Sequence, residues 1–253
     1  MNDNRVLLQQ AVAEFIGPFA LVFLGAGSII MTQGNNLVAI GLAHGLAIGL
    51  MIAAAGHISG GAYNPAVTIG LAIAGKLTPV QTLVYIVAQM LGAVAAAFAL
   101  VAIFPEGFRD PVSLGVPQVG GAFEPLAALL AEVILTFFLM YVIFGAAVDQ
   151  RSDKSIAALA IGLTITIDIF AMGDVTGAAM NPARHFGPAL VENLWTDAWI
   201  WYIGPVVGAV LAAVLYNWVL LDDEIPGVAP GDQEGAQLPD REQPSPRRRR
   251  RRR

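Results

Sequence analysis

The chain contains 253 residues, of which 56% are hydrophobic and 13% are charged, and its mean hydropathy is +0.65. Soluble proteins carry about 25% charged residues on average, so this composition excludes an ordinary soluble domain and indicates an integral membrane protein. The formal net charge is −5, and we expect no nucleic-acid partner. The absence of cysteine excludes disulfides, thiol chemistry and cysteine-ligated metal sites.

Six apolar stretches are long enough to cross a bilayer, for which a helix needs about 20 residues. They cover residues 7–31, 37–55, 79–104, 125–148, 155–172 and 198–221. The first stretch contains Glu14 and lacks a small-residue cleavage site after a short apolar run, so we expect a retained helix and not a signal peptide. The sequence therefore predicts an all-α membrane protein with six spans.

Positive charges are distributed unevenly among the segments between these spans. If both termini are cytoplasmic, only Arg109 and Arg184 lie in the far half of the membrane protein. The inner side then holds Arg5, Lys76, Arg151, Lys154, Arg241 and the run 247–253. We therefore expect a multi-pass protein of the cell (inner) membrane with cytoplasmic N- and C-termini.

Residues 222–253 differ in composition from the rest of the chain. They are rich in proline, glycine and acidic residues and end in seven consecutive arginines. Such a composition cannot bury an apolar core, so the segment is predicted to be a disordered cytoplasmic tail. The arginines could bind anionic lipid headgroups, although a solvated tail without a specific partner is the favoured interpretation.

Residues 1–221 are predicted to form one domain that contains an internal repeat. At a shift of about 117 residues, the segment GHISGGAYNPA at 56–66 aligns with GDVTGAAMNPA at 173–183. Shifts within one residue of this value also align 13–14 with 131–132, 43–46 with 160–163 and 92–94 with 208–210. The two copies cover about 7–104 and about 125–221.

Each copy contains three spans, an odd number, so the second copy must enter the bilayer from the side opposite to the first. The triplets Asn64-Pro65-Ala66 and Asn181-Pro182-Ala183 should then face each other. Each triplet opens a stretch of about ten apolar residues, which as a helix spans about 15 Å, or half a bilayer. Asparagine is a good helix cap and proline suits the first turn. We therefore expect two re-entrant half-helices, and non-helical backbone at that depth implies a water-filled cavity.

The facing triplets have a specific chemical consequence. Two half-helices that meet head to head bring two positive dipole ends, each equivalent to about +0.5 charge, to the centre of the pore, where they repel cations. The side-chain amides of Asn64 and Asn181 can each donate to a passing water, which then cannot readily donate along the file. The alternative is that both asparagines are only helix caps. Capping uses the oxygen and leaves the NH₂ free, so the two roles are compatible.

Several further polar residues are candidates for the same site. The Gly-rich segments 56–63 and 173–180 can present backbone carbonyls to the lumen. Arg184 is an ionisable residue in a membrane segment, for which a functional role is the default interpretation; it could donate to solute and repel cations, or extend to the outer surface. Its repeat partner is the apolar Val67, so the charge is present in one half only.

Glu14 and Glu132 occupy equivalent positions, and buried carboxylates need hydrogen-bond donors. We interpret both as braces for the loops that carry the triplets, with a proton relay as the less favoured alternative. His57 is predicted to be a hydrogen-bonded brace of the first loop in preference to a pH gate. Asp168 lies beside a pore position, but whether it faces the lumen, a neighbouring helix or a subunit interface is left open.

The sequence offers no residues for enzymatic chemistry. No His, Asp and Glu cluster has metal-ligand spacing, and there is no nucleophile–base pattern or phosphate-binding glycine loop. We therefore expect no enzyme activity, no metal and no cofactor.

The segments SGGAYNPAVT at 59–68 and NPARHFGPA at 181–189 resemble the two signature loops of the major intrinsic proteins, the aquaporin family. The resemblance extends through all six spans and leaves out only the tail. It implies the aquaporin-like fold, a homotetramer with one pore in each subunit, the two asparagines at the pore centre, and a narrower four-residue filter towards the outside.

Carried over from the resemblance, the filter positions fall on His44, Ile169, Ala178 and Arg184. This set departs from strict water channels, which carry Phe and His at the first two places, and from glycerol facilitators, which carry an aromatic pair. It is similar to the filters of plant vacuolar-membrane and archaeal aquaporins. Other positions are similar to the water branch, namely His185, Ala189, Trp201 and Tyr202. Many mercury-sensitive relatives carry cysteine at the place of Ala178, so no mercury block is expected.

The sequence thus predicts a passive water channel in membrane lipid that excludes protons and ions and could also pass small neutral solutes such as ammonia. Three alternatives stay open. The first is a facilitator whose main cargo is glycerol or ammonia. The second is an ion channel or proton-coupled transporter, and the third is a non-conducting adhesion or junction protein on the same fold. The two intact triplets and the filter arginine disfavour the last two.

Overall fold

The computed structural model describes residues 3–221, which belong to one compact unit. Every element in this part of the chain is helical, and six helices are long and apolar enough to cross a membrane. The predicted tail at 222–253, with its arginine run, lies outside the described residues. The long helices are α1 (Asp3–Thr32), α2 (Leu37–Ser59), α4 (Pro79–Ile103), α6 (Pro125–Ile143), α7 (Ala157–Thr176) and α9 (Ile200–Leu215).

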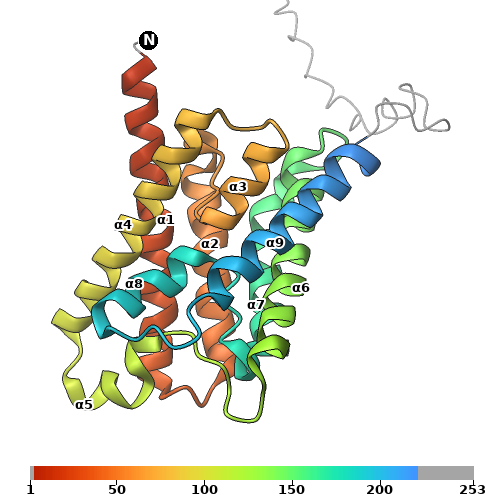
Figure 1. Cartoon of the computed structure of the whole chain (residues 1–253). Coiled ribbons are helices and arrows are strands. Elements are labelled where there is room, and N and C mark those ends of the chain that lie inside the picture. The colour runs from red at the N-terminus through yellow and green to blue at the C-terminus, as the bar shows by residue number, and fades with distance from the viewer. Residues whose placement is uncertain (1–2, 222–253) are drawn as a thin grey trace, which may run out of the picture. The chain divides into compact units, whose positions relative to one another are not determined.

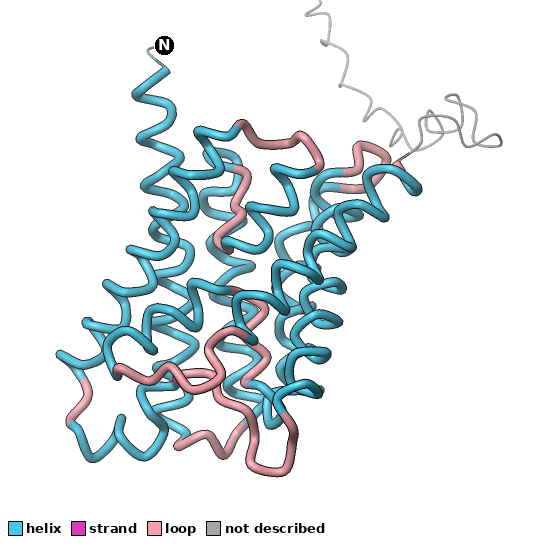
Figure 2. The backbone as a smooth tube through the Cα atoms, viewed as in Figure 1, coloured by secondary structure: helices cyan, strands magenta, loops and turns pink. Residues whose placement is uncertain are grey.

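Two shorter helices complete the predicted repeat, α3 (Pro65–Ile73) and α8 (Pro182–Glu192). Both lie within the bundle, α3 in the half nearer the N-terminus and α8 in the opposite half (Figure 1). The loops that precede them enter the bundle from opposite sides and approach each other in its middle (Figure 2). The expected fold is confirmed: six spanning helices and two re-entrant half-helices form an inverted repeat.

Short helical segments occupy the connections. They are α5 (Glu106–Arg109) and the 3-10 turns η1 (Asp110–Gly115) and η3 (Lys154–Ile156), with the wider π-turns η2 (Phe144–Val148) and η4 (Tyr216–Leu220) at the ends of α6 and α9. The connection 104–124, between the two repeats, has no counterpart in either copy. Its turn η1 includes Ser113 and Leu114 at positive φ, and it brings the Gly115 carbonyl beneath α8.

Two predicted spans end four residues too early. The second was expected to end at residue 55 and the fifth at 172, but α2 continues to Ser59 and α7 to Thr176. Polar residues in these last turns had indicated loop, yet each helix continues until a glycine in the left-handed region ends it, Gly60 at φ 92° and Gly177 at φ 75°. The non-helical approaches to the two asparagines are therefore only four residues long, 60–63 and 177–180.

The two copies exchange their half-helices. Within each copy the first and last long helices pack together, α1 with α4 and α6 with α9, whereas α8 packs on α4 and α3 packs on α9. Helices α2 and α7 cross at the centre through Gly45 and Gly162. A Cβ built on Gly45 would lie 2.3 Å from the Gly162 oxygen, and a Cβ built on Gly162 would lie 2.5 Å from the Gly45 oxygen. Because any larger residue would separate the helices, this glycine pair holds the two repeats in register.

Candidate pore and filter

The two asparagines cap the half-helices with their side-chain oxygens. Asn64 Oδ1 accepts from the backbone N–H groups of Ala66 at 2.9 Å and Val67 at 3.5 Å. Asn181 Oδ1 accepts from Ala183 at 3.0 Å and from Arg184 at 3.4 Å. Pro65 and Pro182 follow at the first helical position, where a missing N–H costs nothing. Each triplet thus points the N-terminus of its helix towards the middle of the bundle.

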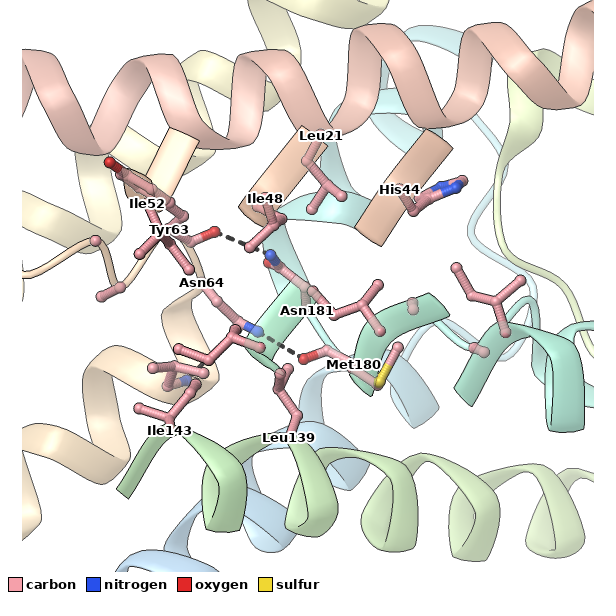
Figure 3. A pocket seen from close by; sticks show the side chains of 18 residues that line it. Leu21, His44, Ile48, Ile52, Tyr63, Asn64, Leu139, Ile143, Met180 and Asn181 are labelled. Carbon is pink, nitrogen blue, oxygen red and sulfur yellow. Dashed lines mark hydrogen bonds between the residues drawn. The ribbon is translucent and has the colours of Figure 1, made fainter. Parts of the chain in front are cut away.

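The amide nitrogens cross between the two repeats. Asn64 Nδ2 donates to the Met180 carbonyl at 2.7 Å, and Asn181 Nδ2 donates to the Tyr63 carbonyl at 3.0 Å (Figure 3). Sequence reasoning had left the whole NH₂ group free. Instead, one of its two hydrogens holds the opposite loop, and the other is left for a ligand. The crossed pair also fixes the direction in which each remaining N–H points.

A cavity passes these two asparagines and is otherwise mostly apolar. Its walls combine a polar strip, formed by the loops before α3 and α8, with aliphatic side chains from α1, α2, α3, α6 and α7. Figure 3 shows Leu21 and Ile48 on one side of the asparagines and Leu139 and Ile143 on another. The remaining aliphatic residues are Ile52, Val67, Ile161, Ile165 and Ile169.

The loops place three non-glycine residues in the left-handed region, which such residues rarely adopt. Tyr63, Ala178 and Met180 have φ between 43° and 52°. This conformation turns successive carbonyls away from the helical direction, and two of them, those of Tyr63 and Met180, accept the crossed amide bonds. The strain is offset by hydrogen bonds from the N–H groups of Tyr63 and Met180 to buried carboxylates and from the Ala178 N–H to Thr176 Oγ1.

Glu14 holds the first loop through four donors. Its Oε1 accepts from Ser59 Oγ at 2.6 Å and the Ala62 N–H at 3.0 Å, and its Oε2 accepts from the Tyr63 N–H and Gln89 Nε2, both at 2.7 Å. The side chain is fully buried. A buried carboxylate of this kind is stable because every neighbour donates.

Glu132 holds the second loop in the same way with one donor fewer. It accepts from Thr176 Oγ1 at 2.8 Å and from the N–H groups of Ala179 at 2.9 Å and Met180 at 2.8 Å. The equivalent of Gln89 in this repeat is Pro205, which has no donor. A second pair of hydrogen bonds is equivalent in the two repeats. Tyr85 donates to the Ser59 carbonyl at 2.8 Å, and its counterpart Trp201 donates to the Thr176 carbonyl at 3.1 Å.

The four residues expected to form the filter come together between two cavities. His44 and Ala178 line the cavity described above, Arg184 lines a second cavity towards the side of η1, and Ile169 lines both. Arg184 is 1% exposed, and its NH1 donates to the Gly115 carbonyl at 2.7 Å. Its Nε–H donates to His44 Nε2 at 3.3 Å.

The tautomer of His44 follows from its two contacts. Nδ1 lies 2.8 Å from the Ile40 carbonyl, which can only accept, so Nδ1 carries the proton. Nε2 is then an acceptor and matches the donating Arg184 Nε–H. The filter therefore presents a buried guanidinium, an imidazole engaged at both nitrogens, one aliphatic side chain and one methyl group.

Two histidines and one aspartate that the sequence singled out lie apart from the four filter residues. His57 lies on the exposed last turn of α2, and no hydrogen bond connects it to the first loop within residues 3–221. His185 is buried under α9, where its ring stacks on Trp201 at a centroid distance of 4.6 Å. Asp168 is 5% exposed and lines neither cavity, and its Oδ2 has no hydrogen-bond partner in the described structure.

Some residues of the site carried little or no sequence signal. Gly115, whose carbonyl holds Arg184, lies in the unrepeated connection, and Gln89 has no counterpart in the second copy. Ser59 and Thr176, by contrast, align in the repeat and could have been identified as paired loop anchors.

Comparison with known proteins identifies the family. The family model described as major intrinsic protein matches residues 2–216. The chain belongs to the major intrinsic protein family. Members of this family are channels and not enzymes, as the sequence had predicted.

The relatives include plant and archaeal aquaporins, as expected from the signature loops. Aquaporin AqpM of Methanothermobacter marburgensis is 41% identical over 240 residues, which cover 84% of this chain and 98% of the relative. The probable aquaporin TIP3-2 of Arabidopsis thaliana is 39% identical, with 85% of this chain and 84% of the relative covered. Among solved structures, the aquaglyceroporin from Plasmodium falciparum superposes with a TM-score of 0.77 at 26% identity, covering 85% of this chain and 97% of that one.

Proposed function

We propose that this channel passes water by passive diffusion and excludes protons and other ions. The observation that carries the proposal is the crossed asparagine pair. Each asparagine caps its half-helix with the amide oxygen and donates one N–H to the opposite loop, so each offers one fixed N–H in the middle of a mostly apolar cavity. A water molecule that accepts from both has its lone pairs engaged and directs its own hydrogens outward along the file.

Proton exclusion follows from this orientation together with the half-helix dipoles. Proton hopping needs a continuous chain in which every water can both donate and accept, and the central water cannot accept a further bond. The N-termini of α3 and α8, which the crossed asparagine bonds bring together, each contribute about half a positive charge at that point. A hydrated cation is opposed by the same field.

The walls explain how water would pass without being held. Aliphatic side chains offer no hydrogen bonds, so a water in the file exchanges only with its neighbours and with the sparse acceptors of the two loops. Sites that bind weakly in series allow entry and exit alike.

The filter composition supports passage of small neutral solutes such as ammonia in addition to water. Ile169 and Ala178 are apolar and Ala178 is small, while Arg184 and His44 use four of their polar groups on each other and on backbone carbonyls. A facilitator whose main cargo is glycerol or ammonia is the alternative that these residues favour, and the similar solved structure is described as an aquaglyceroporin.

The charge of Arg184 argues against the conduction of cations. Its charge lies buried at the boundary between the two cavities, where it opposes the entry of cations. An ion channel, a proton-coupled transporter and a non-conducting junction protein are therefore outcomes that the functional assay must exclude.

Orientation and assembly extend the proposal. Lys76 lies in the α3–α4 connection and Arg151 and Lys154 in the α6–α7 connection, which emerge on the side of the N-terminus, whereas Arg109 emerges opposite. By the positive-inside tendency, both termini face the cytoplasm of the cell (inner) membrane. A homotetramer with one pore in each subunit belongs to the proposal as what the resemblance of the two signature loops to the family implies.

The test is stopped-flow light scattering on proteoliposomes that contain the purified full-length chain. We expect fast shrinkage under an impermeant osmotic gradient, slower entry of glycerol, and no change in shrinkage rate with a pH gradient. Arg184→Val should admit cations that the wild type excludes. Flux no faster than that of empty liposomes would overturn the proposal, and glycerol entry as fast as water exit would establish the facilitator instead.

A further inference from the structure

The imidazole of His44 lies directly against the backbone of α1 at Gly25. A Cβ built on Gly25 would stand 2.4 Å from both Cδ2 and Nε2 of His44 and 2.7 Å from Cε1. Real Cβ atoms essentially never approach other heavy atoms below 3.0 Å. The ring therefore occupies the volume that a side chain at residue 25 would need, and only glycine permits this position.

The remaining contacts of His44 determine where the ring would go if it were displaced. Its Nδ1–H is tied to the Ile40 carbonyl on its own helix, and Nε2 accepts from Arg184 Nε–H. The side away from α1 is the cavity, which His44 lines together with Leu21 of α1 (Figure 3). A ring pushed off α1 must move towards Arg184 and into the lumen.

The second repeat shows the opposite arrangement at the equivalent place. Glu14 aligns with Glu132 at a shift of 118 residues, and the same shift pairs Leu21 with Leu139, both of which line the cavity. It also pairs Gly25 with Ile143, while in the second helix of each repeat, where the shift is 117 residues, His44 pairs with Ile161. Both isoleucines line the cavity. In the second repeat, both positions are aliphatic, Ile143 of α6 and Ile161 of α7. In the first repeat, α1 has no side chain at Gly25, and α2 contributes the imidazole of His44.

We propose that Gly25 is a specificity-determining positioning residue: its missing side chain forms a recess in α1 that holds the His44 ring out of the lumen and in register with Arg184. Gly25 does not touch the solute and acts only through His44. The width of the filter is thereby set from behind, by a helix that contributes no polar group to it. This inference rests on the proposed water-channel function.

Gly25→Ala is the direct test, and α1 supplies its own control. A Cβ on Gly27, two residues further along the same helix, would meet only Leu100 Cδ2 at 3.5 Å, an ordinary contact. Gly25→Ala should lower water permeability about tenfold, which corresponds to about 1.4 kcal/mol in the barrier, and should lower glycerol entry at least as much. Gly27→Ala should match the wild type in both measurements.

The double variant Gly25→Ala/His44→Ala separates positioning from damage to the fold. Without the ring there is nothing to displace, so the double variant should recover the water permeability and glycerol entry of His44→Ala alone, and a double-mutant cycle should show strong coupling. The rescue is expected even if Gly25→Ala by itself fails to fold, because the clash is removed.

Two results would overturn the inference. One is a Gly25→Ala protein with the same water and glycerol permeabilities as Gly27→Ala, and the other is a loss that His44→Ala does not restore. Failure of the proposed function is distinct from both, since the wild type and Gly27→Ala would then show no water flux above that of empty liposomes.

Discussion

Glu14→Gln tests whether the buried carboxylates hold the loops as the structure indicates. All four groups around Glu14 donate to it, so both of its oxygens act as acceptors. A glutamine can replace only one of them. The amide should turn its NH₂ towards Ser59, whose hydroxyl can accept, and this leaves the Ala62 N–H without an acceptor.

The cost can be estimated from these contacts. A buried N–H without an acceptor costs about 1–3 kcal/mol, and the bonds to Tyr63 and Gln89 each weaken by about 1 kcal/mol when the acceptor is neutral instead of charged. The free energy of unfolding should therefore fall by roughly 3–5 kcal/mol. For a chain of this size, each kcal/mol shifts the melting temperature by about 2–4 °C, so the expected decrease is roughly 6–20 °C.

Thermal unfolding of the purified protein in detergent, followed by tryptophan fluorescence, measures this difference. Glu124→Gln is the matched control, because Glu124 is exposed and makes no side-chain capping bond at the start of α6. The control should melt with the wild type. A Glu14→Gln protein that also melts with the wild type would refute the assignment of Glu14 as the brace of the first loop.

Three further predictions follow from other contacts. Tyr85→Phe removes only the donor to the Ser59 carbonyl at the end of α2, so it should lower the free energy of unfolding by about 1 kcal/mol, whereas Trp201→Phe removes the donor to the Thr176 carbonyl and also the buried indole that stacks on His185, so it should lower it by more; a larger loss for Tyr85→Phe than for Trp201→Phe in chemical denaturation would contradict these assignments. Hydrogen bonds from Arg151 lower the pKa of Asp149 from 3.8 to about 2. The ionised Asp149 carboxylate therefore contributes fully to stability above about pH 5, and this contribution is lost as the pH falls towards 2. The melting-temperature difference between wild type and Asp149→Asn should be constant from about pH 5 to 8 and shrink in more acid buffer. A difference that grows in acid would contradict the assignment. The chain has no cysteine, so mercurials should leave water flux unchanged, whereas Ala178→Cys, which places a thiol on the cavity wall, should be blocked reversibly; an insensitive Ala178→Cys channel would show that Ala178 does not line the conducting path.

The fold was predictable because its signals are local and repeated. Apolar length identified the six spans, and the Asn-Pro-Ala triplets, in register between two copies with an odd number of spans, required inverted half-helices. The ends of α2 and α7 were not predictable from polarity. Polar residues such as His57 and Asp174 can occupy a last helical turn near the membrane surface, and the helix ends only where Gly60 or Gly177 adopts positive φ.

The paired loop anchors of the site were predictable because the two copies agree there, and Arg184 was predictable because it is a charged residue in a membrane segment. Glu14 and Glu132 align and both hold their loops, but Gln89 and Gly115 belong to one copy or to neither and act through contacts across more than 60 residues. The recess at Gly25 is of the same kind. A glycine in an apolar helix carries no sequence signal of what it faces, and only the position of the His44 ring reveals its role.

The central claim is that the crossed asparagine pair passes water and stops protons. Its most direct test measures both fluxes in one preparation of proteoliposomes, with light scattering for osmotic shrinkage and an enclosed pH-sensitive dye for proton entry under an imposed gradient. We predict rapid shrinkage with proton entry no faster than in empty liposomes. Proton entry that rises in proportion to water flux would contradict the account, because the central water would then be free to both donate and accept along the file.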